Sequence, residues 1–205
     1  MPRKVAAVPR KLPSQARSAV TVDAVMRATA RILVKRGYQA TTTNHIAEAA
    51  GVSVGSLYQY FPNKEAIVAA LLDRHLEEGQ EFLRQGTANA LGQPLEQAAR
   101  GLIEGLLAAH RVDPDLHRVF AEELPRIATF ERIHKLEQET LALVRAYIEV
   151  RLPELAKKRK VDVVAFVIVH AVEAVTHGAV LFRRDLLEDP AFVDEVARLV
   201  VRYAE

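Results

Sequence analysis

An all-α fold is predicted for this 205-residue chain: an N-terminal three-helix domain, then a C-terminal helical bundle, with about nine helices in total. Apolar residues recur at the three- and four-residue spacing of amphipathic helices through most of the chain. Proline, glycine and capping residues separate these periodic segments, and no strand-rich segment is present. Half of the residues are apolar, which is enough for a sizeable core.

The most informative segment is Thr41–Lys64, which reads as two short helices joined by a tight turn. Thr43 is expected to cap the first helix, and Gly51 to end it with a positive φ. Ser53 is expected to cap the second helix. Pro62 should end that helix, because the residue before a proline is pushed out of the α region. This spacing of caps, turn glycine and apolar positions predicts a helix-turn-helix.

The second of these helices has an exposed face without any acidic residue. Small residues there allow the backbone to approach DNA closely, and tyrosine hydroxyls and amides can reach phosphates or base edges. The face consists of Gly55, Ser56, Tyr58, Gln59 and Tyr60. The alternative, that both tyrosines are core aromatics, is disfavoured because residues two apart cannot both face the core of one helix.

The run GVSVGSLYQYFPNKEAI, preceded by Gly37-Tyr38 and Thr41–Thr43, resembles the DNA-binding domain of TetR-family transcriptional regulators. The resemblance is specific over about Val20–Leu72 and much weaker beyond. It implies that phosphates are held by Thr43, Tyr58, Tyr60 and Lys64. It also implies that the residues near base edges are Ser53, Val54, Gly55, Ser56 and Gln59.

The charge distribution also indicates that the N-terminal part of the chain binds nucleic acid. Residues 1–64 carry ten Lys or Arg and two Asp or Glu, a net charge of +8, whereas residues 65–205 carry a net charge of −6. A basic N-terminal third indicates a polyanionic partner. The chain has no cysteine, which excludes disulfides and thiolate chemistry. We expect no membrane span and no secretory signal, and therefore a cytoplasmic protein.

The elements of the N-terminal part follow in order. Residues 1–19 hold five basic residues, three prolines and no acid, and are predicted to be a disordered arm. This arm is either a solubilising tail or a segment that enters the minor groove. A first helix is predicted over about Thr21–Arg36, followed by Gly37 at its C-terminal end. The DNA-binding domain is assigned to residues 20–66.

The C-terminal part, residues 67–205, is predicted to bind an effector and to dimerise. A long helix capped by Asn63 is expected to run from Lys64 to about Gln85 and to link the two domains mechanically. A polar break is predicted over residues 87–94. Further helices are predicted over about 94–112, 114–124, 127–151 and 162–182 and from Pro190, with a loop at 152–160.

The helix predicted over 162–182 is apolar almost all round, and such a helix must be buried on every side. This indicates an isologous homodimer in which this helix and the last helix pair with their symmetry mates, as the family resemblance also implies. The predicted interface residues are Glu173, His177, Val180, Leu181, Phe192, Val196 and Leu199.

The family resemblance also implies an effector site within the C-terminal bundle. Aromatic and mostly uncharged candidates favour a hydrophobic or aromatic effector, although plain core packing is the alternative for each of them. The candidates are Phe82, Leu106, His110, Phe120, Phe130, His134, Tyr147, Phe166 and His170.

Two constellations suggest metal ligands. His170, Glu173 and His177 share a helical face, with polar contacts in the dimer interface as the alternative. Glu131-x-x-His134 matches half of a di-iron motif, but no second copy is present. Phosphate-binding loops and nucleophile elbows are also missing from the sequence. We therefore predict no catalytic residue, metal or cofactor, and no enzyme.

The sequence thus predicts a ligand-responsive DNA-binding transcriptional regulator. A repressor released from a pseudo-palindromic operator by a small effector is the expected form. The alternative is a helical small-molecule-binding or enzymatic protein that uses the helix-turn-helix only as a scaffold.

Overall fold

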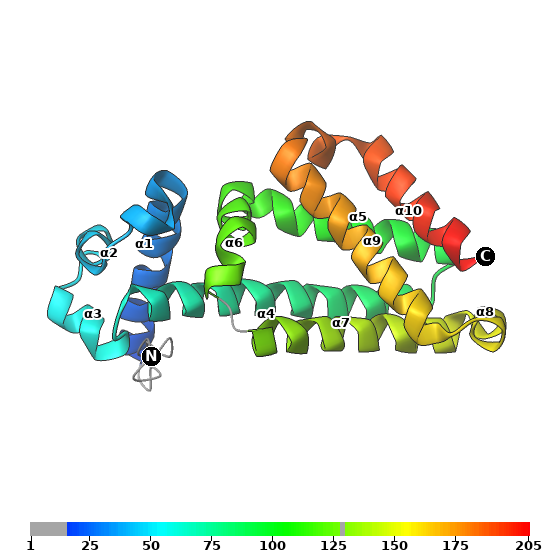
Figure 1. Cartoon of the computed structure of the whole chain (residues 1–205), viewed down its shortest axis with the longest axis horizontal. Coiled ribbons are helices and arrows are strands. Elements are labelled where there is room, and N and C mark those ends of the chain that lie inside the picture. The colour runs from blue at the N-terminus through cyan, green and yellow to red at the C-terminus, as the bar shows by residue number, and fades with distance from the viewer. Residues whose placement is uncertain (1–15, 128–129) are drawn as a thin grey trace. The chain divides into compact units, whose positions relative to one another are not determined.

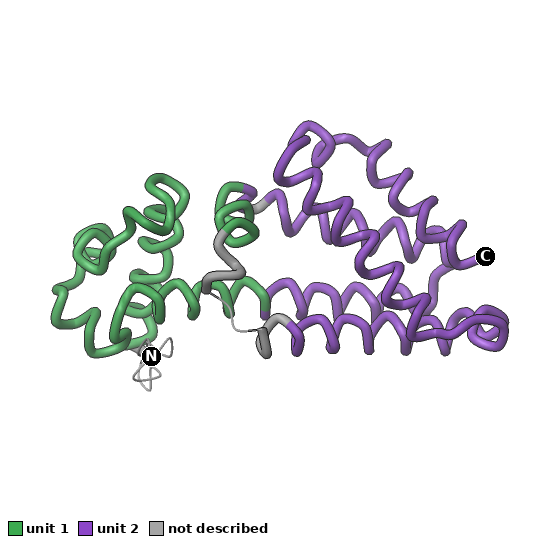
Figure 2. The backbone as a smooth tube through the Cα atoms, in the orientation of Figure 1, with its two compact units in different colours: residues 1–76, 115–129 green, residues 77–114, 130–205 purple. Residues whose placement is uncertain are grey.

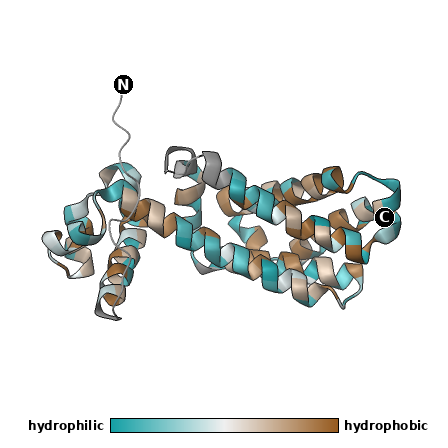
Figure 3. Cartoon of the chain, turned by 90° about the horizontal axis from the view of Figure 1, so that it is seen from below, coloured by the Kyte–Doolittle hydropathy of each residue, from teal (hydrophilic) through white to brown (hydrophobic). Residues whose placement is uncertain are grey.

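The computed structural model describes residues 16–127 and 130–205, and within these ranges it contains ten α-helices, one 3₁₀ helix and no strand (Figure 1). The all-α prediction is therefore confirmed. Hydrophobic and hydrophilic residues alternate along the helices, as the periodicity predicted (Figure 3).

The chain forms two compact units, and the chain passes between them more than once (Figure 2). Unit 1 comprises residues 1–76 and 115–129, and unit 2 comprises residues 77–114 and 130–205. Helix α4 (Lys64–Ala90) contributes to both units, so the boundary predicted after residue 66 falls inside a helix. Most of α6 (Pro114–Ile127) belongs to unit 1, although the sequence placed it in the second domain.

Unit 1 begins with α1 (Ala16–Ala40), α2 (Thr43–Ala50) and α3 (Val54–Tyr60). α1 starts earlier than predicted, so residues 16–19 of the predicted arm are helical; residues 1–15 lie outside the described part of the chain. α1 also extends beyond Arg36, with a kink at Gly37, where φ is 72° and ψ is 171°. Glycine tolerates this positive φ, which a side chain would oppose.

Two apolar clusters hold unit 1 together. One cluster ties α1, α2 and α3 to the start of α4, and its buried members are Val25, Ile46, Ala47, Leu57, Phe61, Ala66 and Ile67. The other joins α1, α4 and α6 through Met26, Leu33, Val68, Leu71, Leu72, Leu116, Val119 and Phe120. The first cluster sets the crossing of α2 and α3, because Ala47 and Leu57 are both fully covered.

Unit 2 contains the second half of α4 and five further α-helices. These are α5 (Leu95–Val112), α7 (Phe130–Arg151), α8 (Pro153–Lys158), α9 (Val161–Phe182) and α10 (Pro190–Ala204), with the 3₁₀ helix η1 (Arg184–Glu188) before α10. Besides α1, three further segments of the chain differ from prediction. α4 continues through 87–90, α6 continues past Pro125, and the predicted loop at 152–160 contains α8, which Pro153 opens.

The core of unit 2 lies where α5, α9 and α10 meet. Its buried side chains include Ile103 and Leu107 of α5, Val180 of α9, and Val193 and Val196 of α10. Val180 and Val196 were predicted to be interface residues, but each is almost fully covered within its own subunit. The hydropathy of a helix shows that a side is buried, not what covers it.

Within a single chain, helix α9 is not buried on every side, and burial of its open face by a second subunit stays a prediction. Val163, Phe166, Val175 and Phe182 are exposed, and Phe182 keeps 80% of its surface. By length and composition alone, α9 is long and apolar enough to cross a membrane, although the sequence predicted no membrane span. Core helices of soluble proteins meet the same criterion, and one face of α9 packs against α5 and α10.

Candidate nucleic-acid interface

The ends of α2 and α3 are set by short-range hydrogen bonds. Thr42, rather than the predicted Thr43, caps α2: its hydroxyl accepts the His45 N–H at 3.2 Å, so Thr43 is the first helical residue. Gly51 ends α2 in the left-handed region, at φ 68° and ψ 30°, as predicted. Ser53 caps α3 by accepting the N–H of Ser56 at 3.0 Å, which confirms that prediction.

Helix α3 turns Leu57 into the core and leaves its opposite face open. Leu57 is fully buried, whereas Val54 and Tyr58 keep 38% and 39% of their surface and Gln59 is exposed. The structure therefore rejects the core-aromatic alternative for Tyr58. No residue of α3 carries a charge, so this face presents neutral donors and small apolar groups to solvent. Such a surface is compatible with close approach to a phosphate backbone.

Gly55 has no structural role within the subunit. It is helical, and an added Cβ would meet nothing closer than the Ser53 hydroxyl, at 3.9 Å. Glycine inside a helix is less favourable than alanine by about 1 kcal/mol. The open space around Gly55 therefore leaves room for another molecule to approach the backbone of α3 closely.

Hydroxyl pairs order the polar side chains of this surface. The Thr43 hydroxyl and the Tyr58 hydroxyl are 3.1 Å apart, and the hydroxyls of Ser53 and Ser56 are 2.8 Å apart. Each hydroxyl can still accept or donate a further hydrogen bond. These pairs fix the start of α2 and the exposed face of α3 as one polar surface.

Two of the predicted phosphate anchors are already engaged within unit 1. The Lys64 ammonium donates to the Tyr38 carbonyl at 3.0 Å and lies 4.5 Å from the centre of the Tyr38 ring. Tyr60 is half-buried and packs against the cluster around Leu57. Of the four predicted anchors, Thr43 and Tyr58 form the exposed pair, while Lys64 and Tyr60 also serve the fold.

Further polar groups at the start of α2 were not predicted from the sequence. Thr42 and Asn44 are exposed there, next to the first free backbone N–H groups of the helix. The Arg36 guanidinium lies 3.3 Å from His45 Nε2, which places a cation beside the same helix end. The run of three threonines followed by asparagine was the available signal, but it does not show which threonine is the cap.

The predicted effector residues belong to both units and differ in burial. Phe120 belongs to the core of unit 1, Phe166 is 50% exposed on α9, and His134 is exposed on α7. Phe82, Leu106, Tyr147 and His170 are partly buried in unit 2, and His110 is buried there. The side chain of Phe130 lies outside the described residues. These residues were selected for aromatic character, which does not determine the direction of a side chain.

A cavity of about 250 Å³ lies instead between α4 and α5 within unit 2. Phe82 is the one member of the predicted set that lines it. The wall combines apolar groups with three amides, and the lining residues are Phe82, Gln85, Gly86, Asn89, Ala90, Gln93, Ala98, Gly101 and Leu102.

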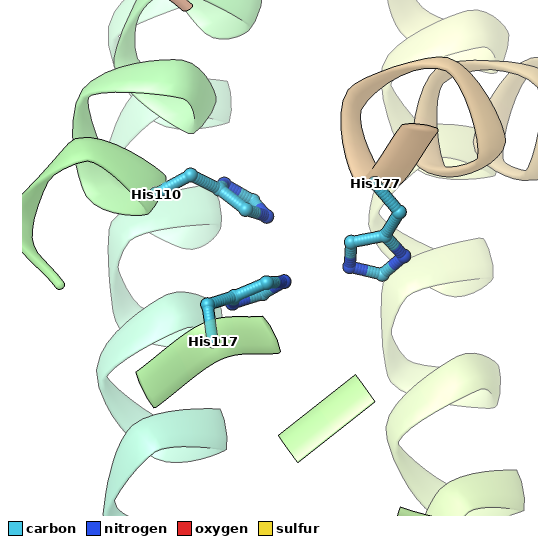
Figure 4. A group of neighbouring side chains, drawn as sticks. All are labelled: His110, His117 and His177. Atoms are coloured by element: carbon cyan, nitrogen blue, oxygen red, sulfur yellow. The ribbon is translucent and has the colours of Figure 1, made fainter. Parts of the chain in front are cut away.

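The proposed triad on α9 separates into two groups. His170 lies 3.2 Å from a Glu137 oxygen of α7 and 3.4 Å from a Glu173 oxygen. His177 instead faces His110 of α5 (Figure 4). His134 of the half di-iron motif pairs with Glu137 at 3.5 Å, whereas the Glu131 side chain lies outside the described residues.

The remaining predicted interface residues have mixed environments. Leu199 is exposed on α10 and Glu173 on α9, whereas His177, Leu181 and Phe192 are half-buried. Phe166 and Phe182, two exposed aromatic residues of α9, were absent from the predicted interface.

The fold and the polar face of α3 define an all-helical helix-turn-helix protein with a second helical unit. Residues 25–71 match the family model of the bacterial regulatory proteins of the tetR family. Residues 94–203, more than half of the chain, match the tetracyclin repressor-like C-terminal domain. The chain belongs to the TetR family of bacterial regulatory proteins, as the resemblance of its N-terminal part predicted.

Individual relatives agree with this assignment. YvkB of Bacillus subtilis, an uncharacterized HTH-type transcriptional regulator, is 39% identical over 89 residues, which cover 43% of this chain and 46% of that protein. The HTH-type transcriptional repressor KstR2 of Rhodococcus jostii is 30% identical over 111 residues, 53% of this chain and 52% of that protein. The chain thus spans about half the length of the curated relatives it matches.

Solved structures share the fold over nearly the whole chain. The fatty acid degradation regulator FadR from Bacillus halodurans has a TM-score of 0.68 at 20% identity, and covers 94% of this chain and 97% of its own. A TetR transcription regulator from Haloarcula marismortui has a TM-score of 0.69 at 22% identity, with 91% and 97% covered.

Proposed function

We propose that this protein is a DNA-binding transcriptional repressor that a small molecule releases from its operator. The observation that carries the proposal is the acid-free, open face of α3, where Gly55 leaves room for close approach of another molecule. Small residues and neutral donors suit a helix that enters the major groove. Membership of the TetR family and the similarity to the repressor KstR2 support it.

The proposed contacts divide into positioning and reading groups. The exposed hydroxyls of Thr43 and Tyr58 would bind phosphate, as would Lys64 and Tyr60 once DNA is present. The base edges would meet Ser53, Val54, Gly55, Ser56 and Gln59. The amide of Gln59 is the group on this face with the strongest capacity to read a base, since an amide can bond adenine in a bidentate manner.

A homodimer would explain the exposed apolar residues of α9 and α10 and would also place two copies of α3 on DNA. The exposed apolar residues of α9, including Phe166 and Phe182, together with Leu199 of α10, would form the subunit contact. Two copies of α3 would then read a pseudo-palindromic operator. A cytoplasmic location follows from this role.

The effector is proposed to bind in unit 2, and the cavity between α4 and α5 supports this part. Its apolar wall and its three amides, Gln85, Asn89 and Gln93, fit a mainly hydrophobic molecule that carries hydrogen-bonding groups. Because α4 begins in unit 1 and ends in unit 2, a change in its tilt would couple the effector to DNA binding.

Selection from a random DNA library, followed by fluorescence anisotropy on the selected duplex, tests the proposal. The wild-type protein should prefer this duplex to a scrambled one, with affinity that falls steeply with salt. Gly55→Glu should abolish the preference by placing a carboxylate against DNA. Gly79→Glu is the matched control, because Gly79 is also helical, exposed and without neighbours within 4 Å.

Failure to enrich any sequence, or equal weak binding to both duplexes, would reject the proposed function. A helical ligand-binding or enzymatic protein with the helix-turn-helix as scaffold would then be the better description. Loss of binding in Gly79→Glu as well would show that Gly55→Glu acts through folding rather than through contact with DNA.

A further inference from the structure

Two histidines from different helices of unit 2 face one another in its interior. His110 is on α5 and keeps only 8% of its surface, and His177 is half-buried on α9. Their ring centroids are 5.6 Å apart with an interplanar angle of 63°, and their ligand nitrogens lie within 4.8 Å of one another. Figure 4 shows that the two side chains point toward each other.

A hydrogen bond to the backbone holds His110 in the tautomer that can bind a metal through Nε2. His110 Nδ1 lies 2.7 Å from the carbonyl oxygen of Leu106, one turn earlier on α5. A carbonyl oxygen can only accept, so Nδ1 carries the hydrogen, and in the neutral ring Nε2 holds the lone pair. Metal-binding histidines usually donate their second N–H to a carbonyl or a carboxylate in this way, which fixes the tautomer and the ring orientation.

The distance between the two ring centroids fits tetrahedral coordination better than square-planar coordination. With Zn–N distances of about 2.0–2.1 Å, the centre of an imidazole ring lies about 3.2 Å from the ion. Two rings with centroids 5.6 Å apart then subtend about 120° at the ion, close to a tetrahedral angle. Two cis ligands of a square-planar ion would bring the centroids to about 4.5 Å, and two trans ligands would separate them to about 6.4 Å.

We propose that His110 and His177 bind a Zn²⁺ ion within unit 2. Zinc accepts imidazole nitrogens readily and favours the tetrahedral geometry that the rings define. Waters or further side chains would complete the coordination. The proposal goes beyond the proposed repressor function and is independent of it, since it requires neither DNA nor an operator.

Cobalt titration of the full-length chain without a histidine tag provides the direct test. Co²⁺ replaces Zn²⁺ in tetrahedral sites and absorbs visible light there, and the chain has no cysteine to contribute thiolate bands. We expect tetrahedral bands that saturate at one ion per chain and disappear when Zn²⁺ is added. Zn²⁺ should also raise the thermal unfolding temperature, because it binds only the folded pair.

His177→Ala and His110→Gln should each weaken the binding of Zn²⁺, measured by calorimetry, by more than about tenfold. His110→Gln retains a hydrogen-bonding side chain at a buried position, and circular dichroism verifies that both variants stay helical. His170→Ala, two turns earlier on α9, is the matched control and should bind as the wild type does. His134→Ala is a second control, because His134 is exposed on α7 of the same unit.

Two results would overturn the proposal. The first is the absence of tetrahedral cobalt bands, which would show that the two rings only pack against each other. The second is binding that survives in both His110→Gln and His177→Ala. If that surviving binding is lost in His75→Ala, the ion binds at His75 and His117 of unit 1, where Nε2 lies 3.1 Å from Nδ1.

Discussion

The hydroxyl oxygen of Thr43 lies 3.1 Å from that of Tyr58, which joins the first residue of α2 to the exposed face of α3. The two residues are on the helices of one helix-turn-helix, and the pair holds the tyrosine ring away from the core. A hydroxyl in this position is ordered before any partner arrives, so less conformational freedom is lost on binding.

Tyr58→Phe removes this hydroxyl and keeps the ring. We expect DNA affinity to fall by about 10- to 100-fold, because a hydrogen bond to a charged group such as phosphate contributes about 1.5–3 kcal/mol. Anisotropy at fixed salt measures the change. Tyr147→Phe is the matched control, since the Tyr147 hydroxyl is buried in unit 2 and should not affect DNA affinity. Equal losses in both variants would contradict a role for Tyr58 at the interface.

Gly55→Ala should change stability and DNA binding in opposite directions. The added Cβ meets nothing closer than 3.9 Å, so the unfolding free energy should rise by about 0.5–1 kcal/mol. The same methyl group should weaken DNA affinity if the backbone of α3 approaches the groove closely. Urea unfolding and anisotropy on the same preparation provide both numbers. Unchanged affinity in the stabilised variant would argue against close approach at this residue.

Gly105→Ala should destabilise unit 2, because a Cβ at this position would clash with the ring of Phe82. Overpacking of this kind costs about 1–3 kcal/mol. Gly101→Ala, one turn earlier on α5, meets nothing within 4 Å and should instead stabilise by about 0.5–1 kcal/mol. Replacing Phe82 with leucine in the Gly105→Ala background should restore part of the loss. Two variants of equal stability would rule out the predicted clash.

Phe182→Glu should dissociate the proposed homodimer, because Phe182 is the most exposed of the large apolar side chains described. A carboxylate there would be desolvated in the subunit contact. Light scattering after size exclusion should show a shift toward monomer. Val150→Glu on α7 also adds a charge at an exposed valine and should leave the dimer intact. A dimer that survives Phe182→Glu would place the subunit contact elsewhere.

The ion pair between Arg183 and Asp185, in the segment after α9, should make the stability of the fold depend on pH in the acid range. The Arg183 guanidinium binds the Asp185 carboxylate, mainly by hydrogen bonds, and holds the pKa of Asp185 below its ordinary value. A carboxyl whose pKa is lower in the folded state stabilises the fold above its unfolded pKa, and this contribution is lost as pH falls through the folded pKa. Arg183→Gln should raise the pKa of Asp185 in an NMR titration. No change would show that the pair does not persist in solution.

Local interactions explain why much of unit 1 was predictable. The cap at Ser53, the positive φ at Gly51 and the cap at Asn63, whose side chain accepts the Ala66 N–H at 2.8 Å, depend on atoms a few residues apart. Even here the cap of α2 fell on Thr42 rather than Thr43. Adjacent threonines offer the same hydroxyl, and only the entry direction of the chain distinguishes them.

Most helices, most of their ends and the neutral face of α3 follow from the sequence alone, because periodicity and capping are properties of contiguous residues. Long-range packing is needed to establish that α6 joins unit 1, that Lys64 folds back onto Tyr38, and that His177 faces His110 rather than His170. A hydrophobic face indicates that this side of the helix is buried, but the residues that bury it are distant in sequence. Packing of whole helices selects them, and no local pattern encodes that choice.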